Sequence, residues 1–303
     1  MAQRYPRWSL PLFMLSLAIA GLAMLLSALH PTSAFMAATP PFATPQLLTD
    51  PFLQLPTSTS VRVVWFTEFP GVRHFVTYGP GLTAPSEQER DRTVTASSTR
   101  LSRTREDQNS RLGSQTAEAI AELKPKPREI WRHEAEVSGL QPGVRLPYQV
   151  TSVQEDGQAV SSRVFSLAAQ PSPKTPLKIL LTSDHQLKPL VSANLQKVVE
   201  TVGSVDAVFF AGDLVNIPDR ASEWFDDDRG GAFFPVLQGR AAYKLKKQGQ
   251  TTVYRGGEII QHAPLFTTIG NHEVMGQYSS ETPLDHQFAD AVPRAIAEVR
   301  YKD

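Results

Sequence analysis

Three short polar motifs in the second half of the chain carry side chains that can bind metal ions. They are Ser183-Asp184-His185-Gln186, Gly212-Asp213-Leu214-Val215-Asn216 and Gly270-Asn271-His272-Glu273. Their carboxylate, amide and imidazole groups suit hard or borderline cations such as Mn, Fe, Zn or Mg. The chain contains no cysteine, which excludes thiolate metal sites, disulfides and a catalytic thiol.

Each motif directly follows a short apolar run that predicts a buried strand. The runs are residues 178–182, 207–211 and 265–269. Apolar residues at helical spacing after the first motif predict a helix from Val191 to Val202, ended by Gly203. Strands in such a β-α-β arrangement run parallel, and ligands bind at their carboxyl ends. The sequence therefore predicts that the three motifs share one site.

The middle of the chain has the β-branched and aromatic pattern of strands. Ser60–Thr67 and Arg73–Tyr78, separated by Pro70-Gly71, predict a hairpin. Further strands are expected at residues 133–137, 148–153 and 163–167. The polar, charged stretch at about 84–128 indicates a solvated insertion or, as the alternative, a patch that binds an anionic ligand.

A turn before one of these strands favours an immunoglobulin-like sandwich. Leu140-Gln141-Pro142-Gly143 leads to Tyr148, an arrangement that resembles a tyrosine corner. We therefore expect a fibronectin type III-like β-sandwich over residues 45–171. A stiff proline-rich linker, 172–176, and an α/β domain, 177–303, follow it.

The first 38 residues have the pattern of an export signal. Arg4 and Arg7 precede the apolar run 10–29, and small residues follow it. The run is also long enough to span a bilayer, so a cleaved signal peptide and a retained membrane anchor both stay open. We expect a secreted or periplasmic protein, or one anchored through residues 10–29. The balanced charge, 30 basic against 30 acidic residues, gives no reason to expect nucleic-acid binding.

In this order, and each after a strand, the three motifs resemble the calcineurin-like metallophosphoesterase superfamily. A fibronectin-like domain in front resembles its purple acid phosphatase branch. The resemblance implies two divalent or trivalent ions (Fe, Zn or Mn), the first held by Asp184, the second by Asn271 and both bridged by Asp213. It also implies that His272 faces the phosphoryl group and that Glu273 orients His272. The implied reaction is hydrolysis of a phosphate ester by metal-bound hydroxide.

The chain departs from the family pattern in three places. The family has His or Gly two residues after the first Asp, whereas this chain has Gln186, so Gln186 as a weaker oxygen ligand or a water would fill that position. The purple branch has Tyr three residues after the bridging Asp; Asn216 stands there, so an iron–tyrosinate colour is not expected. The histidine motifs that complete the family's site do not follow Glu273.

These departures leave two interpretations open. The first is an exported, acid phosphatase-like phosphoesterase whose α/β domain is incomplete, as in an N-terminal piece of a longer enzyme that is inactive by itself. The alternative is a non-catalytic extracytoplasmic binding or adhesion protein with a degenerate metal domain.

Overall fold

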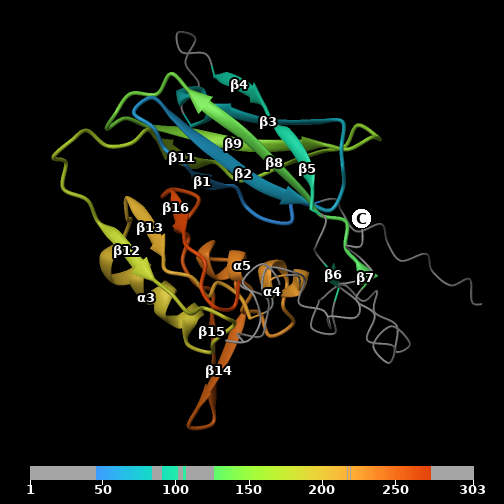
Figure 1. The fold of residues 1–303 in the computed structure, drawn as a ribbon, viewed down its shortest axis with the longest axis vertical. Coiled ribbons are helices and arrows are strands. Elements are labelled where there is room, and N and C mark those ends of the chain that lie inside the picture. Colours follow the sequence, from blue (N-terminus) through green and yellow to red (C-terminus); the bar gives the residue numbers. More distant parts are fainter. Residues whose placement is uncertain are drawn as a thin grey trace, which may run out of the picture. The chain divides into compact units, whose positions relative to one another are not determined.

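The computed structural model describes residues 46–83, 91–101, 105–106, 126–216, 218 and 220–273 of the 303-residue chain. All of them lie in one compact unit, residues 45–303 (Figure 1). The expected signal or anchor, residues 1–38, and the part of the α/β domain after residue 273 lie outside the described residues. None of the helices in the described ranges is long and apolar enough to cross a membrane.

The amino-terminal part of the described chain is a β-sandwich of two antiparallel sheets. Strands in the first sheet follow the order β1 (Phe52–Gln54), β2 (Ser60–Thr67), β8 (Trp131–Ser138) and β5 (Ser97–Arg100). Strands in the second follow the order β10 (Ala159–Ser161), β9 (Arg145–Val153), β3 (Arg73–Tyr78) and β4 (Arg92–Thr95), and β11 (Phe165–Ala168) also pairs with β9. A 3-10 turn, η1 (Pro80–Leu82), and a short ladder of β6 (Arg105–Glu106) with β7 (Lys126–Pro127) complete this part.

The hairpin expected from Ser60–Thr67 and Arg73–Tyr78 is wrong. β2 pairs with β1 and β8, whereas β3 pairs with β4 and β9, so the chain crosses between the sheets at Pro70-Gly71. The physical reason is that both strands bury side chains in the same core from opposite sides. The insertion expected at 84–128 also needs correction, because β4 and β5 within it add one strand to each sheet.

Two stacked histidines lie inside the sandwich. The rings of His74 on β3 and His133 on β8 are 3.7 Å apart with an interplanar angle of 16°. Their four ring nitrogens have hydrogen-bond partners at 2.6–2.8 Å, namely Ser152 and Pro70 for His74, and Thr67 and Ser98 for His133. Burial lowers the pKa of both rings, that of His133 to about 3. Both are satisfied core histidines.

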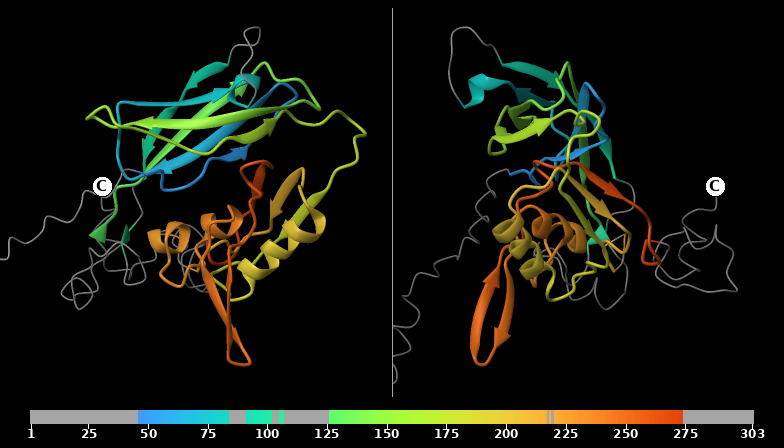
Figure 2. Two further views of the ribbon diagram at one scale, coloured as in Figure 1. Left: turned by 180° about the vertical axis from the view of Figure 1, so that it is seen from behind. Right: turned by 90° about the vertical axis from the view of Figure 1, so that its left-hand side faces the viewer.

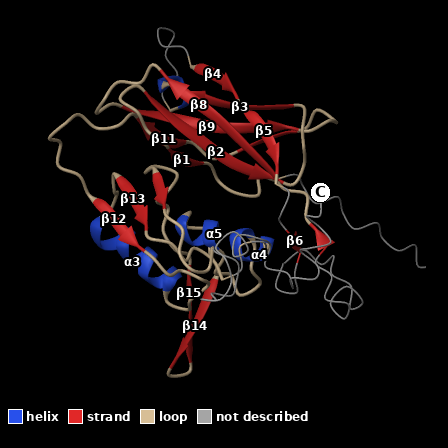
Figure 3. Cartoon of the chain, in the orientation of Figure 1, coloured by secondary structure: helices blue, strands red, loops and turns tan. Residues whose placement is uncertain are grey.

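The second part contains the expected β-α-β unit. Its parallel sheet has the order β12 (Ile179–Thr182), β13 (Ala207–Phe210) and β16 (Leu265–Thr267). The helix α3 (Val191–Val202) joins the first two strands and ends at Gly203, as predicted. The chain segment that connects β13 to β16 forms the short helices α4 (Ala221–Phe225) and α5 (Phe233–Leu237) and the hairpin of β14 (Tyr243–Lys247) and β15 (Gln250–Tyr254), all labelled in Figure 3.

The three-stranded sheet is apolar on both faces, but only one face is buried. Val208, Phe210 and Leu265 belong to a core that also contains residues of α3 and α5. The right-hand view of Figure 2 shows the helices on one side of the sheet. On the other face Leu181, Phe209 and Phe266 lie in one row across the strands. Leu181 is 73% exposed and Phe209 is 42% exposed. The expectation that these strands are buried therefore holds for one face only.

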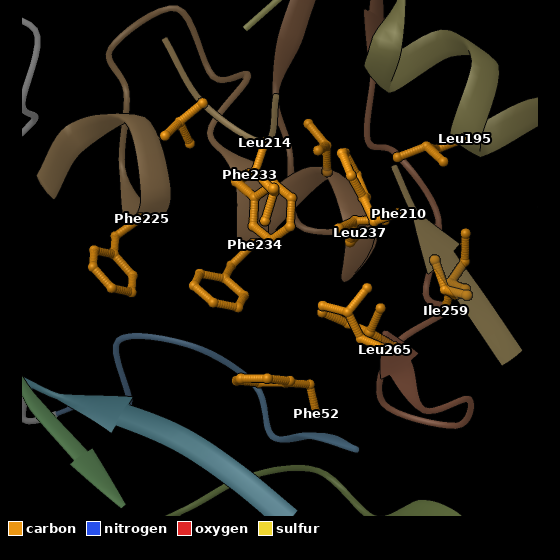
Figure 4. Packing of buried hydrophobic residues seen from close by; sticks show 14 of the residues in the cluster. Phe52, Leu195, Phe210, Leu214, Phe225, Phe233, Phe234, Leu237, Ile259 and Leu265 are labelled. Carbon is orange, nitrogen blue, oxygen red and sulfur yellow. The ribbon is translucent and has the colours of Figure 1, made fainter. Parts of the chain in front are cut away.

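This second core also includes side chains from the sandwich. Phe52, Val64, Phe66 and Ile130 pack in the same cluster as the helices of the second part. The Phe52 and Phe66 rings lie 5.1 and 5.3 Å from the ring of Phe234 (Figure 4). The outer face of the first sheet is therefore covered where the second part packs against it.

Buried polar contacts join the same two parts. Arg128, whose side chain is 3% exposed, donates to both oxygens of Asp226 (3.0 and 2.8 Å) and to Glu68 (2.8 Å). The Tyr148 hydroxyl donates to the main-chain oxygen of Gln261 at 2.7 Å. A hydroxyl has one proton to donate, so the tyrosine corner expected at Tyr148 is wrong: the proton is used across the interface.

Candidate functional site

The three polar motifs lie side by side at the carboxyl end of the parallel sheet. The amide of Asp184 donates to the Gly212 oxygen at 3.2 Å, which links the first two loops. The amide of His272 donates to Oδ1 of Asp213 at 3.0 Å, which links the second and third. Parallel strands in register end at the same edge, so the β12, β13 and β16 pairing accounts for this convergence.

Two glycines allow the second and third loops to touch. Gly212 has a φ of +85°, and a Cβ there would lie 2.5 Å from the Gly270 nitrogen. A Cβ on Gly270 would overlap the Asp213 carboxylate. Any side chain at either position would push the loops apart, so both glycines are needed for the close approach.

Both candidate carboxylate ligands sit on strained backbone. Asp184 and Asp213 each have a φ of 57°, in the left-handed region, and so do Gln186 (42°) and Leu187 (58°). Left-handed residues other than glycine cost free energy and cluster at functional sites. Here they fall at the ends of two adjacent strands, where each chain turns sharply out of the sheet.

The Asp184 side chain is exposed and already has partners. Its oxygens accept hydrogen bonds from the Ser183 hydroxyl at 2.6 Å and from Nζ of Lys188 at 3.2 Å. The Ser183 hydrogen bond, and then Lys188, lower the pKa of Asp184. The carboxylate is therefore ionised at neutral pH, but a bound cation would have to displace or share the Lys188 ammonium.

Glu273 connects the loops through their backbones. Its carboxylate accepts hydrogen bonds from the amides of Asp213 (2.8 Å), Leu214 (2.8 Å) and Gly270 (2.7 Å). The group beside Nδ1 of the His272 ring is instead the main-chain oxygen of Asn216, at 3.0 Å. These contacts make Glu273 a clamp between the second and third loops, whereas its expected role of orienting His272 stays a prediction.

The imidazole of the first motif points into the core. His185 is 4% exposed and packs edge-on against Phe210, with ring centroids 4.5 Å apart. Its Nε2 lies 3.2 Å from the Thr182 hydroxyl, and its buried Nδ1 has no hydrogen-bond partner among the described residues. Burial lowers its pKa to about 3. His185 is therefore a neutral core residue in this arrangement.

The amide side chain that follows is also largely buried. The main-chain N–H of Gln186 donates to the main-chain oxygen of Leu214 at 3.2 Å, and the main-chain oxygen of Gln186 accepts from Nδ2 of Asn216 at 3.2 Å. Gln186 thus ties the first loop to the second through its main chain. Its expected contribution as a weaker metal ligand stays a prediction.

Residues 49–169 match the family model described as the purple acid phosphatase N-terminal domain. The sandwich is therefore similar to the N-terminal domain of purple acid phosphatases. This confirms the purple acid phosphatase-like relationship that the sandwich suggested, and it relates the chain to a family of phosphatases. No curated protein matches the chain in sequence.

Solved structures give weaker similarities. A purple acid phosphatase from seeds of yellow lupin (Lupinus luteus) is 19% identical with a TM-score of 0.49, over 78% of this chain and 37% of the lupin chain. The FN5 domain of Drosophila Lar is 15% identical with a TM-score of 0.24, over 43% of this chain and 100% of that domain. Both TM-scores are below 0.5, so the assignment depends on the family model alone.

The described residues do not by themselves form the two-ion centre implied by the family resemblance. No group of three or more His, Asp or Glu side chains converges within the ranges that the structure describes. Asp184, Asp213 and Asn271 offer oxygen donors at neighbouring strand ends, a set suited to one hard cation. The two imidazoles of the motifs do not add nitrogen donors to this set. His185 is buried, and Nδ1 of His272 lies beside a main-chain carbonyl oxygen.

Several contacts in this site had no signal in the sequence. Lys188 beside Asp184, the Asn216 oxygen beside His272 and the three amides around Glu273 are set by loop geometry. The contacts of His272 and Glu273 use main-chain atoms, which carry no signal of residue type. Only the Gly-Asp and Gly-Asn spacing after strands pointed to the region.

Proposed function

We propose that this chain contributes the Asp184, Asp213 and Asn271 ligands of a phosphoesterase active site that hydrolyses phosphate esters. The observation that carries the proposal is the convergence of the three motif loops beside one sheet edge, in a chain whose sandwich is similar to the N-terminal domain of purple acid phosphatases. Asp184 and Asp213 would bind a hard cation through carboxylates, and Asn271 would bind through its amide oxygen. Gln186 would be a weaker ligand.

In this proposal the third motif serves the substrate. His272 would face the phosphoryl group, and Glu273 would hold the second and third loops together through the amides it binds. The two-ion centre, with Fe, Zn or Mn, requires donors beyond the described residues. The α/β part would then be the amino-terminal portion of a metallophosphoesterase domain.

A second candidate function is a non-catalytic binding protein outside the cytosol. It is favoured by the lack of three converging His, Asp or Glu side chains in the described ranges. It is also favoured by the Lys188 ammonium, which already neutralises Asp184. Under this alternative the sandwich and its interface with the α/β part would carry the binding function.

Hydrolysis and metal binding by residues 39–303 separate these candidates. We would measure hydrolysis of a chromogenic phosphomonoester with Mn²⁺ or Zn²⁺, and cation binding by calorimetry, for the wild type and Asp213→Asn. Asp206→Asn is a matched control, because Asp206 stands at the opposite end of β13 and accepts from the Lys178 amide at 2.9 Å. If the wild type and Asp206→Asn both hydrolyse the ester and bind the cation, and Asp213→Asn does neither, the result supports the phosphoesterase.

Two other outcomes would count against the phosphoesterase. Metal binding without hydrolysis, lost in Asp213→Asn, supports the binding protein. Neither signal in the wild type contradicts the proposed site in this chain.

We also propose that the protein is exported, with residues 1–38 as its signal or anchor. The support is the charged start and the apolar run 10–29. Expression of the full chain followed by amino-terminal sequencing of the extracytoplasmic product tests it: a start near residue 39 indicates cleavage, and an intact terminus in the membrane fraction indicates an anchor. Retention in the cytosol contradicts export.

A further inference from the structure

A buried carboxylate lies directly behind the candidate site. Glu223 on α4 has a side chain that is 2% exposed, and its Oε2 accepts a hydrogen bond from the Asn216 amide at 2.6 Å. Its other oxygen, Oε1, lies 3.6 Å from Nη1 of Arg220. Burying a carboxylate is costly unless hydrogen bonds and an ion pair offset the loss of water. Glu223 therefore holds the Asn216 peptide through a strong, charge-assisted contact.

Asn216 is the point at which the three motif loops meet. Its amide is held by Glu223 at 2.6 Å, and its side-chain Nδ2 donates to the Gln186 oxygen of the first loop at 3.2 Å. Its main-chain oxygen lies 3.0 Å from Nδ1 of His272 in the third loop. The position of this one residue therefore decides where the acceptor beside the His272 ring is.

The acceptor beside the ring also decides which ring nitrogen carries the proton. A carbonyl oxygen accepts hydrogen bonds and never donates, so Nδ1 of His272 must carry the hydrogen. The neutral ring then has its lone pair on Nε2. A neutral imidazole without such a partner is free to carry its proton on Nε2 instead. The Asn216 oxygen thus selects the tautomer and the orientation of His272.

We propose that Glu223 is a positioning residue for His272, acting through the Asn216 peptide to hold the ring as the Nδ1–H tautomer, which leaves the lone pair on Nε2. The consequence for catalysis depends on the proposed function, in which His272 faces the phosphoryl group. The tautomer itself does not depend on it, because it follows from the two hydrogen bonds. The two ideas can therefore fail separately.

Long-range ¹H–¹⁵N NMR of the imidazole rings tests the proposal on residues 39–303. Spectra are recorded at about pH 8.5, well above the ordinary imidazole pKa of about 6.5, and the His272 signals are assigned by their loss in His272→Gln. The wild type should show a protonated Nδ1 and an unprotonated Nε2. Glu223→Ala should shift His272 to a mixture of tautomers, whereas Glu223→Gln, which keeps an acceptor oxygen, should retain Nδ1–H.

Two further variants keep the test decisive. Asn216→Ala removes only the side chain and leaves the amide and oxygen in place, so it should retain the Nδ1–H tautomer. Glu223→Asp keeps the charge but withdraws it by one methylene, so it should lose the tautomer even if Glu223→Ala fails to fold. A wild-type ring protonated on Nε2, or a folded Glu223→Asp with unchanged Nδ1–H, overturns the proposal.

Phosphomonoester hydrolysis, measured in parallel, distinguishes a failure of the proposed function from a failure of the positioning role of Glu223. If the wild type hydrolyses the ester and the tautomer responds to Glu223, we expect kcat to fall by at least tenfold in Glu223→Asp with little change in KM. If the wild type does not hydrolyse it but the tautomer still responds, the proposed function fails and the positioning role stands. If the wild type hydrolyses the ester but the His272 tautomer does not respond to Glu223, the proposed function stands and the positioning role fails.

Discussion

The two hydrophobic cores of the described chain are enclosed in different ways. The sandwich core lies between the two sheets of the β-sandwich and contains Val61, Val63 and Trp65 of β2. The second core has one sheet of its own, and its other side is closed by Val64 and Phe66, which also belong to β2. Alternate residues of a single strand therefore serve two cores.

This difference shows how the two parts of the molecule depend on one another. The hydrophobic residues of the sandwich core all come from the sandwich itself, although the hydroxyl of Tyr148 in that core donates to Gln261 of the α/β part. The α/β core is not complete without the sandwich, because Phe52, Phe66 and Ile130 fill one side of it. The candidate loops stand on that second core, so their geometry depends on the sandwich surface beneath it.

The largest expected loss of stability comes from substitutions at two neighbouring residues of β2, one in each core. Trp65→Ala and Phe66→Ala should each cost about 3–5 kcal/mol, as usual for buried aromatic residues. Phe66→Ala should remove hydrogen-exchange protection from α3 while β9 stays protected. Trp65→Ala should remove protection from both, because the sandwich supports the second core. Equal loss in β9 and α3 for Phe66→Ala would instead make the two cores one cooperative unit.

An intermediate effect is expected from acid, and buried histidines of both parts, His133 in the sandwich and His185 in the α/β part, should contribute to it. Below the unfolded pKa of about 6.5, the unfolded chain binds protons that the buried His133, with a folded pKa of about 3, does not. Stability should therefore fall as the pH drops, by about 2 kcal/mol at pH 5 from His133 alone. Urea unfolding between about pH 7 and 5 measures it. His133→Gln should reduce this slope by the share of His133, and the shares of His74 and His185 should remain.

The smallest effect should come from the uncovered face of the α/β sheet. Leu181→Ser replaces a side chain that is 73% exposed, so it should change stability by no more than about 0.5 kcal/mol and reduce self-association. Leu180→Ser, on the covered face, should cost about 2 kcal/mol or more. Thermal unfolding and light scattering measure both changes. A loss above about 2 kcal/mol for Leu181→Ser would mean that other residues cover this face.

Much of the framework followed from local pattern. The helix Val191–Val202 was predicted to the residue because its apolar spacing and Gly203 are local signals. The parallel strands before the three motifs followed from apolar runs of strand length, and their common carboxyl edge followed from the β-α-β connection. The partial alternation in β2 was harder to interpret, since a strand buried on both faces is apolar throughout.

The incorrect predictions concern partners that are distant in sequence. The hairpin between Ser60–Thr67 and Arg73–Tyr78 was wrong because turn residues also connect facing sheets. The corner expected at Tyr148 was wrong because its hydroxyl reaches Gln261, 113 residues away. In both cases the local chemistry was compatible with two partners, and packing selected one.

The sequence by itself determined the strand and helix periods, the Gly-Asp and Gly-Asn loops and the chemistry that those loops offer. Only the tertiary structure decided that His185 turns into the core, that Asp184 meets Lys188, and that the main-chain oxygen of Asn216 lies beside Nδ1 of His272. The physical reason is that propensity and hydrophobic period act over a few residues. The direction of a loop side chain depends on hydrogen bonds and van der Waals contacts with segments that folding brings together.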